Sequence, residues 1–212
     1  MAGGVAAGGH AAGMVEDAQR RPLADLLGLI ALLWLVECVD LALQATLGLR
    51  LDYYGLRPME LRGLFGLVTA HFLHVDFSHL IANTLSLLLL GLLAMAYSAR
   101  LAWRALALAA LTAGGFTWCF AQPGSIHIGA SGCVFGLFGW LLANGLFRSS
   151  CLAFLLSLVV FLLYGGALIG LLPNQDGALQ ISWQMHLGGF IGGVWASWLQ
   201  RHENRHENRH GD

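Results

Sequence analysis

The sequence predicts an all-α, polytopic membrane protein folded as a bundle of six transmembrane helices. Of its 212 residues 57% are hydrophobic and 11% are charged, and the mean hydropathy is +0.67. Soluble domains carry roughly 25% charged residues. Six long apolar segments alternate with polar stretches, and each approaches the ~20 residues that cross a hydrocarbon core. Two of these segments also space small residues four apart, as closely packed membrane helices do.

The remaining composition narrows the function classes. A net charge of −1 gives no reason to expect nucleic acid as a partner, and the lipid bilayer is the expected surroundings. The four cysteines show no CxxC spacing, and no HExxH motif occurs, so a zinc protease is excluded and no metal site is expected. The sequence does not indicate an oligomeric state.

Residues 1–22 are rich in Ala and Gly and end in charged residues, so they are predicted to be a disordered cytoplasmic segment. Residues 23–47 form the first predicted span, and it is retained because no A-x-A-like cleavage site clearly follows it. This span carries Glu37 and Asp40, for which a structural role is expected. Residues 48–66 mix charges, tyrosines and apolar residues, which is typical of a loop in the headgroup region, with short amphipathic helices as one form it can take.

Five further spans complete a membrane domain over residues 23–199. The second begins near His71 or His79 and ends near Tyr97, and the rest are predicted at 101–120, 131–147, 151–172 and 181–199. A polar turn at 173–177 precedes the last span. Residues 200–212 repeat Arg-His-Glu-Asn and are predicted to be a low-complexity, solvated cytoplasmic tail.

The arginines predict the orientation. With six spans both termini lie on one side, and that side collects eight of the eleven basic residues, while the long first loop carries three. The positive-inside rule therefore places both termini in the cytoplasm, for a protein of a bacterial inner membrane, and the start of the fourth span faces the outer side.

The fourth span begins with a Gly-x-Ser-Gly turn formed by Gly129, Ala130, Ser131 and Gly132. A serine at the start of an apolar helix can expose its hydroxyl, and the free N–H groups of the helix N-terminus can hold an oxyanion. Small residues also serve helix packing in membranes. The turn alone therefore leaves both a nucleophile and a packing role open.

His79 and Asn83 lie four residues apart in the second span, and thus on one helix face. Two polar side chains inside a membrane cost free energy unless each has a hydrogen-bond partner. They can form hydrogen bonds with each other or with a loop backbone, or they can donate hydrogen bonds to a developing oxyanion in a dry site. The sequence leaves these two interpretations equal.

The sixth span carries His186, followed by the small-residue series that contains Gly189 and Gly193. Because the fourth span has the same spacing at Gly132 and Gly136, we expect these two spans to pack together. Such packing would bring the Ser131 hydroxyl and the His186 imidazole within the reach that a nucleophile and its base require. A core histidine bonded to a neighbouring helix is the alternative.

No carboxylate follows the pattern of a triad acid, so the pair would be a Ser–His dyad. Asp176 belongs to the turn before the sixth span, outside the predicted bundle. His71 and His74 are expected to cap the second span or order the loop before it, and His127 is a loop residue beside the serine turn. Their roles stay open.

These motifs together resemble the rhomboid family of intramembrane serine proteases, over residues 23–199. The resemblance rests on GASG with Ser131, HLIAN with His79 and Asn83, and HLGGFIGG with His186, in this order on spans two, four and six. It implies a serine endopeptidase that cleaves single-span membrane proteins in or near the membrane and needs no cofactor. Ser131 would be the nucleophile, His186 the general base, and His79, Asn83 and the Ser131 N–H the oxyanion hole. Gly129, Gly132, Phe135 and Gly189 would support this site.

Two features depart from the family pattern. Many rhomboids have a Trp-Arg pair in the first loop, where this sequence has Glu60-Leu61-Arg62-Gly63, and several place a tyrosine where this chain has Phe135. A phenyl ring can still stack on an imidazole. A catalytically inactive relative that binds or escorts transmembrane segments is the main alternative to an enzyme. A transporter is less favoured, because charged pairs and broken spans are scarce.

Overall fold

The computed structural model describes residues 6–173 and 182–201. Within these ranges the chain is helical and contains no strand, which confirms the all-α prediction. The helices run in the order α1 (Ala6–Leu47), η1 (Leu51–Tyr54), η2 (Leu61–Phe65), α2 (Gly66–Thr69), η3 (Ala70–Phe72), α3 (Phe77–Phe120), α4 (Ser131–Phe147), α5 (Cys151–Tyr164), η4 (Gly165–Leu171) and α6 (Trp183–Gln200).

Among the described residues, three helical stretches are long and apolar enough to cross a membrane. They are Arg21–Leu47, α3, and the stretch Cys151–Leu171 that combines α5 with η4. The apolar α4 is shorter, at 17 residues. The number of six crossings is therefore not confirmed and stays a prediction.

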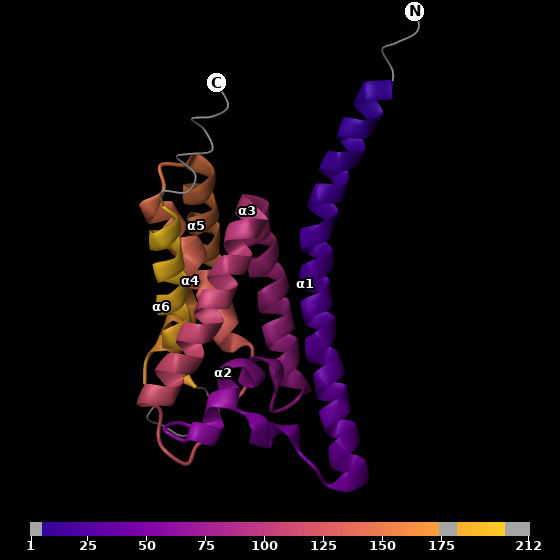
Figure 1. Cartoon of the computed structure of the whole chain (residues 1–212). Helices are drawn as coiled ribbons and strands as arrows, with labels where there is room; N and C mark the ends of the chain where they lie inside the picture. The colour runs from indigo at the N-terminus through magenta and orange to yellow at the C-terminus, as the bar shows by residue number, and fades with distance from the viewer. Residues whose placement is uncertain (1–5, 174–181, 202–212) are drawn as a thin grey trace, which may run out of the picture.

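The second and third predicted spans are the two arms of α3. At Ser98 the backbone leaves the helical region, with φ −165° and ψ 110°, and the chain reverses its direction there (Figure 1). Each arm has about 21 residues and is about 32 Å long. That length matches a hydrocarbon core of about 30 Å.

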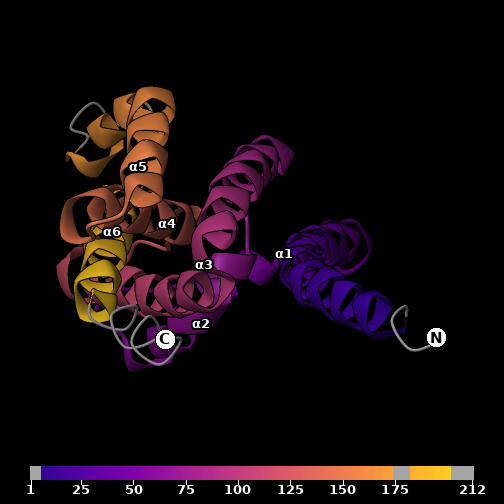
Figure 2. The ribbon, with the colours of Figure 1, turned by 90° about the horizontal axis from the view of Figure 1, so that it is seen from above.

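The bundle is built around α4, which packs against α3, α5 and α6. Every residue from Gly132 to Leu141 is buried. Viewed from above, α1 stands at the edge of the bundle beside α3 (Figure 2). The N-terminal end of α1 and the C-terminal end of α6 lie at one end of the bundle, and the start of α4 lies toward the other (Figure 1). The candidate site is at this second end.

Close contact between α4 and α6 depends on glycine, as the sequence predicts. A Cβ atom on Gly189 would overlap the carbonyl oxygen of Gly132, and one on Gly193 would overlap that of Gly136. Larger residues at these positions would hold the two backbones apart. The glycines therefore set the distance between the helix that carries Ser131 and the helix that carries His186.

The segment between α1 and α3 contains the short helices that the sequence allows for the first loop. Asp40, which is buried in α1, accepts a hydrogen bond of 2.5 Å from the Leu51 N–H, so its role is structural, as expected. The loop is anchored without a Trp-Arg pair, because Trp118 Nε1 donates to the Glu60 carbonyl at 3.1 Å and the Met59 N–H donates to the Trp118 carbonyl at 3.2 Å.

The predictions for the two ends of the chain stay predictions. The disorder predicted for residues 1–22 is untested, although α1 is assigned from Ala6 through that segment. Most of the predicted tail, the turn that contains Asp176, and the first residue of the sixth predicted span lie outside the described residues.

Candidate active site

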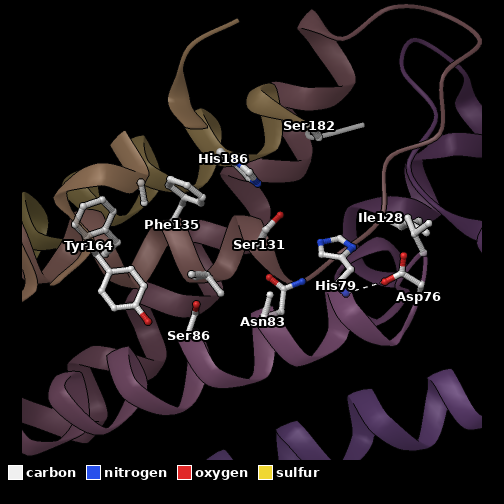
Figure 3. Close-up of a pocket in the computed structure, with 15 residues that line it drawn as sticks. Asp76, His79, Asn83, Ser86, Ile128, Ser131, Phe135, Tyr164, Ser182 and His186 are labelled. Carbon is white, nitrogen blue, oxygen red and sulfur yellow. Dashed lines mark hydrogen bonds between the residues drawn. The ribbon is translucent and has the colours of Figure 1, made fainter. Parts of the chain in front are cut away.

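A cavity of about 410 Å³ lies where α3, α4, η4 and α6 meet (Figure 3). It contains both residues of the predicted dyad and both side chains of the predicted oxyanion hole. The wall is mostly apolar, with Val134, Phe135, Phe138, Tyr164 and Ala167 on one side. The polar groups that line it are those of Asp76, His79, Asn83, Ser86, Ser131, Ser182 and His186.

Ser131 is the first residue of α4, and its side chain is half-buried. The hydroxyl points toward the ring of His186, with His79 and Asn83 on the other side of it (Figure 3). Among the described residues no hydrogen bond joins the Ser131 hydroxyl to His186. Such bonds are often long in structures without substrate and tighten in the reacting complex.

The turn before Ser131 is fixed by its neighbours in the first loop. The Gly129 N–H donates to the Ala70 carbonyl at 2.8 Å, and the Ala130 N–H donates to Nε2 of His74 at 3.4 Å. Gly129 has φ +125°, a backbone conformation that favours glycine. These contacts give His74 the loop-ordering role that the sequence allows.

His186 is buried and is held on two sides. Its ring stacks on Phe135, with 4.1 Å between the ring centroids and 16° between the planes. Its Nδ1 lies 3.1 Å from the Gly170 carbonyl oxygen. A carbonyl can only accept, so Nδ1 carries the proton and the lone pair of the neutral ring is on Nε2. This tautomer has a free proton acceptor.

His79 and Asn83 both lie against the Gly129 backbone. A Cβ atom on Gly129 would be 3.0 Å from Nε2 of His79 and 3.7 Å from Nδ2 of Asn83. Asn83 is 5% exposed, and its Nδ2 has no hydrogen-bond partner among the described residues. A buried amide donor without a partner is costly. This observation favours donation to a bound group over the alternative in which the two side chains satisfy each other.

Asp76 is a residue that the sequence analysis missed. It precedes α3, and its Oδ1 accepts from the His79 N–H at 2.8 Å and from the Ser78 hydroxyl at 2.6 Å. These hydrogen bonds, first that of Ser78, hold the pKa of the Asp76 carboxyl below its usual range. An Asp just before an apolar helix is a common N-cap and was the available sign.

Gly170 is the second missed residue, because its contribution is a backbone oxygen. The sequence predicts one continuous span to Leu172, whereas α5 ends at Tyr164 and the chain continues as the 3₁₀ helix η4. Within this 3₁₀ helix the Gly170 carbonyl oxygen lies 3.1 Å from Nδ1 of His186. No side-chain pattern indicates it.

His71 and His127 lie outside the cavity wall and have structural contacts. His71 Nε2 donates to the Ala110 carbonyl at 3.0 Å, which links η3 to the second arm of α3. His127 contacts two serines, one of which is the N-cap of α6. Burial lowers the pKa of both imidazoles, so both are held neutral.

Comparison with known proteins agrees with this arrangement. The family model described as "Rhomboid domain" matches residues 61–203, which is more than half of the chain. The chain belongs to the rhomboid family.

The relatives of this rhomboid include mycobacterial proteins that are described as uncharacterized. Proteins of Mycobacterium bovis and Mycobacterium tuberculosis are 41% identical over 180 residues, which cover 82% of this chain and 73% of each relative. A protein of Mycobacterium leprae is 38% identical over 180 residues, with 82% of this chain and 69% of the relative covered. The family and the apolar helices together indicate a multi-pass membrane protein.

Proposed function

We propose that this rhomboid is an intramembrane serine endopeptidase that cleaves single-span membrane proteins in or near their transmembrane segment. The observation that carries the proposal is the shared cavity of Ser131 and His186, in which the imidazole keeps Nε2 free to accept a proton. The expected partners are transmembrane substrates and the lipid bilayer, and the reaction needs no cofactor.

The first step is acylation of Ser131. His186 Nε2 takes the hydroxyl proton as Ser131 Oγ attacks the scissile carbonyl, and the imidazolium then gives that proton to the leaving amine. The proton on Nδ1 stays with the Gly170 carbonyl, which takes the orienting place of a triad acid. A water molecule then hydrolyses the acyl enzyme with His186 acting again as base.

The negative charge of the tetrahedral intermediate needs donors that are already in place. The unpaired Nδ2 of Asn83, the imidazole of His79 and the Ser131 N–H at the start of α4 are the proposed set. The first N–H groups of a helix have no partner within it, so the backbone donor costs no existing bond.

The proposed location is a bacterial cell membrane, with both termini in the cytoplasm. The arginine distribution and the mycobacterial relatives support it. In this orientation the cavity opens toward the outer side, where water for hydrolysis is available.

A serine-reactive fluorophosphonate tests the proposal on detergent-solubilised protein. The probe should label the wild type, and the labelled peptide should carry Ser131. Ser131→Ala and His186→Ala should abolish both labelling and cleavage of a single-span substrate while the protein stays folded. Ser86 is the internal control, because its hydroxyl lines the same cavity but does not belong to the proposed dyad. Labelling that maps to Ser86, or wild-type turnover in either variant, would contradict the dyad.

The same experiment separates an enzyme from an inactive relative. An inactive rhomboid would retain transmembrane segments in a pull-down without labelling by the probe. Labelling of Ser131 together with cleavage would exclude that alternative.

A further inference from the structure

His127 joins three segments that are distant in the sequence. Its backbone forms an antiparallel bridge with Leu56 of the first loop, with hydrogen bonds of 3.0 and 2.9 Å. Its imidazole lies between two hydroxyls, with Nε2 2.8 Å from Ser125 Oγ and Nδ1 2.8 Å from Ser182 Oγ. Ser182 is the N-cap of α6, the helix that carries His186.

The direction of each hydrogen bond that links Gln122, Ser125, His127 and Ser182 can be derived. The Ser125 hydroxyl lies 2.5 Å from the Gln122 carbonyl, which can only accept, so the Ser125 proton goes there. Ser125 Oγ must then accept from Nε2–H of His127. In a neutral imidazole the other nitrogen is an acceptor, so Nδ1 accepts from the Ser182 hydroxyl. Burial lowers the pKa of His127, which agrees with a neutral ring.

Ser182 connects this series of hydrogen bonds to His186, the proposed general base. Its Oγ accepts from the Met185 N–H at 3.3 Å, and its carbonyl accepts from the His186 N–H at 3.1 Å. Met185 is fully buried, and a Cβ atom on Gly132 would lie 2.9 Å from its Cγ. The position of Ser182 therefore determines how the first turn of α6 sits against the start of α4.

We propose that His127 is a positioning residue for the imidazole of His186 and acts through the Ser182 cap of α6. The inference rests on the proposed function, because it concerns the alignment of His186 with Ser131. An imidazole that accepts from Ser182 fixes the direction of the cap hydroxyl, and the cap fixes the turn that carries the base. Small misplacements of a catalytic group can cost about 10²-fold in rate.

Three substitutions distinguish the two nitrogens of His127. In His127→Asn the side-chain oxygen can take the place of Nδ1 and accept from Ser182, whereas in His127→Gln the side chain reaches the place of Nε2 and Ser125. His127→Phe keeps a ring and removes both contacts. We expect the acylation rate of Ser131 to stay within about threefold in the Asn variant and to fall by about 10- to 100-fold in the other two. A loss of folding would lower the final extent of labelling, whereas a misplaced base lowers the labelling rate constant and leaves the final extent unchanged.

Ser150→Ala provides a matched control. Ser150 caps α5 as Ser182 caps α6, and its Oγ accepts from the Ala153 N–H at 3.3 Å. Losing a serine cap destabilises the protein. The control should therefore lower the melting temperature as a lost cap does, with no change in the acylation rate.

A double variant tests the route through the cap. If His127 acts through Ser182, the combination of His127→Phe with Ser182→Ala should lower the acylation rate no further than the more severe single variant. Losses that multiply would overturn the inference. Wild-type labelling rates in His127→Phe would also overturn it.

The measurement is time-resolved fluorophosphonate labelling of the full-length protein in detergent, with a thermal unfolding curve for every variant. If His127→Phe does not fold, the Asn and Gln variants decide the question, and equal rates in these two would overturn the inference. A wild type that is not labelled at Ser131 would overturn the proposed function and the inference with it. A labelled wild type with an inert His127 would overturn the inference alone.

Discussion

Nδ1 of His186 lies 3.1 Å from the carbonyl oxygen of Gly170, where a triad protease would place a carboxylate. A neutral carbonyl fixes the tautomer of the imidazole but stabilises an imidazolium less than a carboxylate does. The remaining constraint on the ring is the stacked face of Phe135. The proposed general base is therefore held by one backbone oxygen and one aromatic ring.

Removing the ring of Phe135 should impair catalysis more than stability alone explains. Phe135→Ala leaves a cavity, which costs about 3–5 kcal/mol in a buried site, and frees the His186 ring. We expect the acylation rate to fall by at least about tenfold. Phe135→Tyr keeps the stacked ring and should retain the rate. The measurement is fluorophosphonate labelling together with thermal unfolding.

Leu137→Ala is the control for the cavity. Leu137 is buried on the same helix and does not line the cavity of the candidate site, and its truncation costs about 2–5 kcal/mol. An equal loss of acylation rate in Leu137→Ala would show that stability, and not the stacked ring, explains the effect of Phe135.

A side chain at Gly129 should close the proposed oxyanion hole. The Cβ atom in Gly129→Ala would lie 2.6 Å from Cε1 of His79, so the imidazole would have to move. The positive φ adds about 1–3 kcal/mol of backbone strain. We expect acylation of Ser131 to fall below detection in the labelling assay while the protein remains folded.

Gly124→Ala separates strain from obstruction. Gly124 lies in the same loop with φ +84°, and a Cβ atom there would meet nothing within 4 Å. Both variants should lose melting temperature, and only Gly129→Ala should lose acylation. Comparable labelling of the two variants would argue against an oxyanion hole beside Gly129.

The sequence predicted the parts of the site that depend on side-chain identity and on helix periodicity. His79 and Asn83 share a face of α3, and the glycine series of α4 and α6 meet, because both follow from spacing along a helix. Their meeting also identified Ser131 and His186 as neighbours. What remained hidden was set by backbone geometry.

The contact of the Gly170 carbonyl is of this hidden kind. The end of α5 at Tyr164 and the 3₁₀ geometry after it place the Gly170 carbonyl, and the apolar sequence there also fits a longer helix. Such features depend on tertiary packing, which local propensity does not determine.

The variant Gly193→Ala tests the contact between α4 and α6 at a position away from Ser131 and His186. In Gly193→Ala the new Cβ atom would overlap the Gly136 carbonyl oxygen, so the helices must separate. Overpacking of this kind costs about 1–3 kcal/mol. We expect a lower melting temperature and a reduced labelling rate, because α6 also carries His186. In Gly115→Ala a Cβ atom would meet nothing within 4 Å, so this helix variant should be stable and fully labelled. Equal behaviour of the two variants would contradict the close contact.

Acid should weaken the loop that holds the serine turn. His74 accepts from the Ala130 N–H through Nε2, so it must be neutral there. Burial, followed by the neighbouring His79, lowers the pKa of His74 to about 4, whereas an unfolded histidine titrates near 6.5. Between these values the unfolded chain binds more protons than the folded one, so stability falls as the pH falls from about 6.5 to about 4.

His74→Gln isolates this contribution. Its side-chain oxygen can accept from the Ala130 N–H in the place of Nε2, and it does not titrate. The melting temperature of the wild type should fall between pH 7 and pH 5, at a cost of at most about 1.4 kcal/mol per pH unit for this histidine. The fall should be shallower in His74→Gln, and His71 and His127, whose pKa values burial also lowers, contribute to what remains. Identical slopes in the two proteins would mean that His74 does not carry the acid sensitivity.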